Sequence, residues 1–103
     1  MKTERTRIAF ESFADGRVTV KKPGGKTYAT LNFGEESVGV TRYYNALNAD
    51  VHISRVIHTP QHRKIKANFL AEIDGEEFVV KEAQHKNATF PKVTVLVLAE
   101  AGT

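Results

Sequence analysis

"FLAEIDGEEFVVK" (residues 69–81) is the stretch that decides the fold class. Asp74-Gly75 stands between two short runs rich in apolar and β-branched residues. An Asp-Gly pair readily adopts the positive φ angles that a tight hairpin turn requires. The stretch therefore predicts a β-hairpin that joins residues 69–73 to residues 77–81.

Similar patterns recur along the rest of the chain. A second Asp-Gly pair, Asp15-Gly16, predicts a hairpin between residues 7–11 and 17–21. Further strands are expected at residues 28–33, 51–57 and 93–98. Residues 93–98 are apolar on both faces, as in a central strand that is covered on each side. These strands predict a mainly β protein, a small six- or seven-stranded barrel or sandwich with one short α-helix.

Length and composition indicate one ordinary globular domain. The chain has 103 residues, 41% of them hydrophobic and 26% charged, with a net charge of +3 and no cysteine. We expect a single domain over residues 1–103, with residues 1–5 as a flexible tail. The basic start is followed by no long apolar run, so neither a signal peptide nor a membrane anchor is expected.

The helix is expected at about residues 41–48, with Thr41 as its N-cap. The stripe predicted to face the core comprises Tyr43, Ala46 and Leu47. The residues predicted to face outward, and to bind a partner, are Arg42, Tyr44, Asn45 and Asn48. An alternative role for this helix is to plug an open end of the barrel.

Sequence patterns that resemble catalytic or metal sites do not hold when their chemistry is considered. Pro23-Gly24-Gly25-Lys26-Thr27 resembles the end of a phosphate-binding loop, but Val20 stands where the first glycine of that motif belongs. His58 and His62 have the spacing of a helical metal pair, but Pro60 lies between them and no third ligand is evident. We therefore expect a hairpin turn at the glycines, and no catalytic residue, cofactor or metal ion.

A basic run follows, in a loop expected over residues 59–67. With His58 at its start, the loop carries His62, Arg63, Lys64 and Lys66. These side chains could contact phosphate groups without regard to base sequence. The run has no interleaved aromatic residue on which bases could stack. A solubilising loop and a contact with an acidic partner are therefore alternatives to a DNA contact.

Two short motifs resemble those of a known family. The expected helix contains Tyr43-Tyr44-x-Ala46, and the second hairpin contains Asp74-Gly75 followed by Phe78 and Val80. In this respect the chain resembles the head-tail joining, or head-closure, proteins of long-tailed bacteriophages. Their helix often carries Tyr-Tyr-x-Ala, and their hairpin often reads apolar-x-Asp-Gly-x-x-aromatic-x-apolar. The resemblance is closest over residues 37–99.

The resemblance implies a structural function in the virion. Such proteins form a ring beneath the portal and its adaptor after DNA packaging, retain the genome and offer a platform to the tail. The implied partners are portal, adaptor and tail proteins and further copies of the chain, which could be a monomer in solution. No membrane or small-molecule substrate is implied. The implied location is the head-tail interface, after assembly in the bacterial cytoplasm.

Two other functions remain open from the sequence. A tail-completion or tail-terminator protein has a similar size and also forms a ring. A small nucleic-acid-binding barrel would bind DNA in isolation, with an affinity that falls as salt rises.

Overall fold

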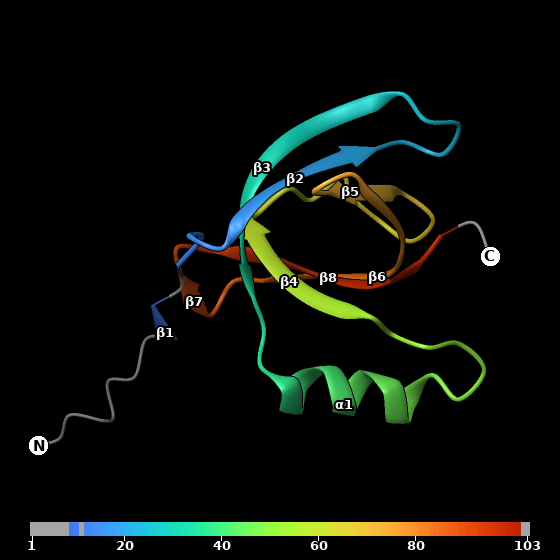
Figure 1. Cartoon of the computed structure of the whole chain (residues 1–103). Helices are drawn as coiled ribbons and strands as arrows, with labels where there is room; N and C mark the ends of the chain where they lie inside the picture. Colours follow the sequence, from blue (N-terminus) through green and yellow to red (C-terminus); the bar gives the residue numbers. More distant parts are fainter. Residues whose placement is uncertain (1–8, 11, 102–103) are drawn as a thin grey trace, which may run out of the picture.

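The computed structural model describes residues 9, 10 and 12–101 and shows a closed antiparallel barrel with one helix beside it (Figure 1). The barrel strands are β2 (Gly16–Lys21), β3 (Thr27–Glu35), β4 (Arg55–Pro60), β5 (Leu70–Ile73), β6 (Glu76–Lys86) and β8 (Val93–Glu100). Outside the barrel lie α1 (Val38–Leu47) and the parallel pair β1 (Ala9–Phe10) and β7 (Thr89–Phe90). The mainly β fold class is confirmed. The tail expected at residues 1–5 lies outside the described residues.

Strand order explains how the barrel closes. The order is β2-β3-β4-β8-β6-β5, and β5 pairs back to β2. The predicted hairpin at Asp74-Gly75 is confirmed, because this pair joins β5 to β6 with φ angles of 52° and 81°. The register of β6 shifts between Val80 and Glu82, and the strand pairs with β5 near its start and with β8 along most of its length. β6 is thus one long, bent strand that pairs with β5 on one side and with β8 on the other.

The hairpin predicted at Asp15-Gly16 is wrong. Instead, β2 pairs with β3 through the turn at Gly24-Gly25, where the sequence predicted a hairpin turn. The Asp15 carboxylate accepts a hydrogen bond from the Glu35 backbone N–H at 2.7 Å, which fastens the start of β2 to the end of β3. Gly16 has φ +150°, and a Cβ there would lie 2.9 Å from the Phe33 ring. This glycine therefore permits a close approach and does not form a turn.

Two apolar clusters lie on opposite faces of the β4–β8 pair. The cluster inside the barrel comprises Val18, Val20, Phe33, Ile57, Ile65, Phe69, Ala71, Ile73, Phe78, Val80, Leu96 and Leu98. The cluster outside it comprises Tyr44, Ile53, Val56, Val93, Val95 and Val97. Successive side chains of β8 alternate between the two clusters, so the prediction of a central strand covered on both faces is confirmed.

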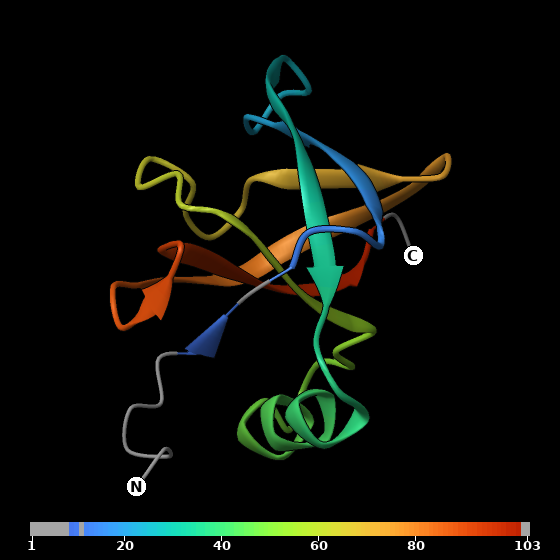
Figure 2. The same ribbon diagram turned by 90° about the vertical axis from the view of Figure 1, so that its left-hand side faces the viewer.

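Helix α1 covers the outer face of this strand pair and does not plug an end of the barrel (Figure 2). It begins at Val38, earlier than expected, because Ser37 and not Thr41 is the N-cap. The Ser37 Oγ accepts a hydrogen bond from the Val40 N–H at 3.2 Å. Asn48 is the C-cap, and its side chain donates to the Tyr44 carbonyl at 2.8 Å.

The face of α1 that packs on the barrel is the opposite of the predicted one. Tyr44 is 6% exposed, whereas Tyr43 and Leu47 are 60% and 61% exposed. The Asn45 amide fixes the rotation of the helix, because its oxygen accepts from the Ile53 N–H at 2.7 Å and its nitrogen donates to the Ile53 carbonyl at 3.0 Å. This pairing turns Tyr44 onto the valines of β8.

The strand expected at residues 51–57 lies later in the chain. Residues 51–54 form a bend and irregular backbone, although the Ile53 side chain is fully buried under α1. β4 then runs from Arg55 to Pro60 and pairs with β8 over its whole length. The expected loop at residues 59–67 therefore begins only at Gln61.

Burial of Tyr44 predicts a loss of stability at alkaline pH. Burial, with the nearby Glu82 carboxylate as a lesser cause, raises the pKa of Tyr44 above its ordinary value of 10.0. In the unfolded chain the phenol ionises first, so its stabilising contribution is full below pH 10 and decreases as the pH rises above it. Urea unfolding from pH 8 to 11 should show a smaller alkaline decrease for Tyr44→Phe than for the wild type. Parallel decreases in the two proteins would contradict the prediction.

Candidate interaction surfaces

A cavity of about 570 Å³ opens between the β2–β3 turn and the segment that leads from β4 to β5. We call it the basic cavity. Its lining residues are Lys22, Pro23, Tyr28, Arg63, Lys64, Lys66 and Phe69. Three of the residues predicted for a phosphate contact, Arg63, Lys64 and Lys66, thus lie together.

The segment of residues 61–69 is anchored to the barrel at several points. Ile65 is fully buried in the barrel core, and Phe69 is 5% exposed. The His62 N–H donates to the Thr94 hydroxyl at 2.9 Å, and the Gln61 amide donates to the Lys86 carbonyl at 3.1 Å. These anchors hold the backbone that carries the exposed basic side chains in a defined place.

Aromatic rings that are remote in sequence complete the cavity. The Tyr28 ring makes edge contacts with His62 and Phe69, at centroid distances of 5.7 and 5.8 Å. The Lys22 ammonium lies 5.8 Å from the centroid of the same ring. Sequence reasoning missed Lys22, Tyr28 and Phe69 as site residues. Tyr28 fell in the strand expected at residues 28–33, but no local signal indicated that this strand meets the basic segment.

The cations of the basic cavity have no counter-charge among the residues that the structure describes. No described carboxylate forms an ion pair with the cavity's cations, Lys22, Arg63, Lys64 and Lys66. Lys21 differs, since it pairs with Glu72 at 3.0 Å, and the hydrogen bond and charge of Glu72 raise its pKa above the ordinary value of 10.5. The cavity therefore gathers four cations that form no ion pair with any described carboxylate.

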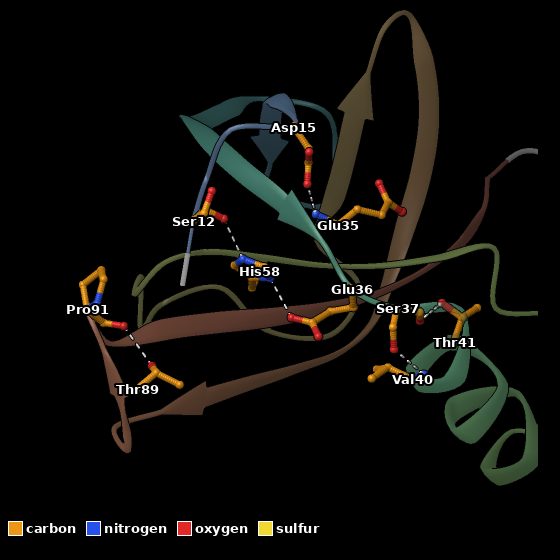
Figure 3. A network of polar contacts seen from close by, with 10 residues as sticks. All are labelled: Ser12, Asp15, Glu35, Glu36, Ser37, Val40, Thr41, His58, Thr89 and Pro91. Carbon is orange, nitrogen blue, oxygen red and sulfur yellow. Dashed lines mark hydrogen bonds and ion pairs between the residues drawn. The ribbon is translucent and has the colours of Figure 1, made fainter. Parts of the chain in front are cut away.

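His58 does not belong to this surface, and its expected position in a solvated loop is wrong. It lies in β4, is 7% exposed and is not among the residues that line the basic cavity. Its Nδ1 lies 2.6 Å from a carboxylate oxygen of Glu36, and its Nε2 lies 2.8 Å from the Ser12 carbonyl oxygen (Figure 3). Both neighbours are hydrogen-bond acceptors, so the imidazole links the Ser12 segment to the end of β3.

The exposed side of α1 is a second candidate surface. We call it the outer helix face; its members are Val38, Arg42, Tyr43, Ala46 and Leu47. Val38, Tyr43 and Leu47 are each at least 60% exposed. Of the residues predicted to bind a partner, only Arg42 is on this face. Tyr44 is buried, and Asn45 and Asn48 are half-buried and hydrogen-bonded to backbone, because the helix packs on the barrel through the side predicted to face outward.

Across residues 9, 10 and 12–101, no three His, Cys, Asp or Glu side chains gather closely enough to hold a metal ion. Within the same residues, no helix has the length and apolar character needed to span a membrane.

Comparison with known proteins found no matching family model, no matching curated protein and no matching solved structure. What can be said of function therefore depends on the two surfaces and on the motifs of the sequence.

Proposed function

We propose that this chain is a non-enzymatic structural protein of a bacteriophage or prophage virion. It would form a ring beneath the portal complex, retain packaged DNA and provide the platform on which the tail attaches. The observation that carries the proposal is the outer helix face, on the helix whose Tyr43-Tyr44-x-Ala46 motif resembles that of head-closure proteins.

An apolar helix face of this kind supports docking between proteins. Exposed apolar side chains are normally scattered, whereas Tyr43 and Leu47, four residues apart, are neighbours on the exposed side of a ten-residue helix. Full burial of such a side chain contributes about 1.5–3 kcal/mol. Tyr and Arg are the residue types enriched at the energetic centres of interfaces, which Tyr43 and Arg42 would supply.

The barrel gives this face a rigid support. Tyr44 and Asn45 fix α1 against β4 and β8, so the outer helix face keeps one orientation relative to the barrel. A preformed surface binds with a smaller loss of conformational entropy. In a ring each copy repeats the contact, so that an interface too weak to hold two free monomers can hold the assembled particle.

Tyr43→Ala/Leu47→Ala tests the proposal in the phage or prophage that encodes the chain. Loss of both side chains should reduce infectious particles at least tenfold and leave DNA-filled heads without tails. Plaque titres and electron microscopy of the lysate measure these effects. Phe90→Ala is the matched control, because it removes an aromatic side chain of similar exposure, 63%, from β7.

Two outcomes would contradict the proposal. Wild-type titres for the double variant would show that the outer helix face is not needed for assembly. If antibody labelling finds the protein on free tails and not on filled heads, the tail-completion or tail-terminator alternative is correct instead.

A further inference from the structure

We infer that the basic cavity binds single-stranded nucleic acid, with its cations on the phosphodiester backbone and Tyr28 against a base. The inference concerns a different surface from the outer helix face and does not depend on the proposed virion function. It begins from the two segments that form the cavity, the β2–β3 turn and residues 61–69.

Charge is the first reason. Lys22 stands on one side of the cavity and Arg63, Lys64 and Lys66 on the other, and none of them is neutralised by a described carboxylate. A polyanion that spans the opening can meet both sides at once. Each phosphate that it places there releases condensed counterions, which favours binding at low salt.

The second reason is the ring between the cations. Single-strand binding sites combine a positively charged groove with aromatic side chains on which bases stack. Tyr28 is half-buried and held by edge contacts with His62 and Phe69. The Lys22 ammonium also lies near the Tyr28 ring. Because the Lys22 side chain is flexible, its ammonium can move onto a phosphate when a base stacks on the ring.

The ring also indicates which polyanion fits. An acidic peptide would neutralise the cations but would not use the aromatic surface. A duplex presents phosphates, but its bases are stacked on one another and cannot reach Tyr28. A single strand provides both groups, so we expect it to bind more tightly than a duplex of the same length or an acidic polypeptide.

Fluorescence anisotropy of the purified full chain tests the inference. The probe is a labelled single strand of about 12 nucleotides, titrated at several salt concentrations. Four phosphate contacts predict a slope of about −2.8 in a plot of log affinity against log salt. Lys22→Gln/Arg63→Gln/Lys66→Gln leaves one cavity cation, so the slope should become shallower, at about −0.7. The affinity at low salt should fall at least tenfold.

Two further variants separate the site from general electrostatics. Arg17→Gln/Lys81→Gln/Lys92→Gln removes the same charge from exposed positions outside the cavity and should change affinity far less. Tyr28→Leu should weaken single-strand binding several-fold without changing the salt slope, and should leave duplex binding unchanged. Circular dichroism confirms that each variant is folded.

Several results would overturn the inference. No binding at low salt would exclude the site, and equal losses in the two triple variants would show that only net charge matters. Polyglutamate that competes as well as the unlabelled strand would point to an acidic protein partner. Because the purified chain needs no capsid, none of these results depends on whether the proposed virion function is correct.

Discussion

Gly34→Ala is expected to lower the free energy of unfolding by about 3 kcal/mol, because the added methyl group overpacks the site and breaks two part-buried hydrogen bonds. A Cβ at this position would overlap the Ser12 carbonyl oxygen and the His58 imidazole. The glycine is required by space and not by backbone conformation, because Gly34 is not among the residues with positive φ. Neither the Ser12 carbonyl nor the His58 imidazole can move away freely, because the two are hydrogen-bonded to each other.

The hydrogen bonds that would be lost are those of the His58 network (Figure 3). The imidazole lies 2.8 Å from the Ser12 carbonyl oxygen and 2.6 Å from the Glu36 carboxylate. A methyl group on Gly34 would push the ring away from both partners and break these two part-buried hydrogen bonds.

Urea unfolding at neutral pH measures the effect, and Gly39→Ala is the matched control. Gly39 lies in α1, where an added Cβ would meet only the Ser37 hydroxyl, at 3.8 Å. That substitution should raise the free energy of unfolding by about 0.5–1 kcal/mol, because alanine favours helix. If Gly34→Ala unfolds at the same urea concentration as the wild type, the close packing around His58 is not as described.

Local sequence patterns predicted the elements that depend on local chemistry. The Asp74-Gly75 hairpin and the two-sided apolar strand at residues 93–98 are of this kind. Asp15-Gly16 has the same dipeptide but a different function, because Gly16 admits the Phe33 ring and Asp15 binds the backbone of Glu35. The dipeptide alone does not reveal which of these two requirements a glycine meets.

The candidate surfaces were predictable only in part, for a similar reason. A basic segment is visible in the sequence, but its approach to Tyr28 depends on barrel closure, which brings β3 near residues 61–69. His58 looked like a loop residue because Pro60 follows it closely, yet β4 extends to that proline and ends there, so His58 and Thr59 belong to the strand. A strand tolerates proline where its missing N–H is not needed, so Pro60 ends β4 without excluding the residues before it.

Helix orientation was the largest error, and two single substitutions test its correction. Tyr44→Ala is expected to lower the free energy of unfolding by about 3–4 kcal/mol, because it opens a cavity over the valines of β8. Tyr43→Ala is expected to change it by less than about 0.5 kcal/mol, since the side chain is 60% exposed. Tyr43 does contact the Tyr44 ring edge-on at a centroid distance of 5.2 Å, but alanine offsets that loss through its higher helix propensity.

Urea unfolding of both variants decides which face of α1 is buried. Tyr44→Phe keeps the ring and should recover most of the stability that Tyr44→Ala loses, which separates packing from the hydroxyl group. The opposite pattern, with Tyr43→Ala the damaging change, would restore the helix face first expected from the sequence. It would also remove the basis of the infectivity test, because a loss of titre in Tyr43→Ala/Leu47→Ala indicates lost docking only if the folded barrel survives the substitutions. The stability of these tyrosine variants therefore determines whether the outer helix face can be read as an interface.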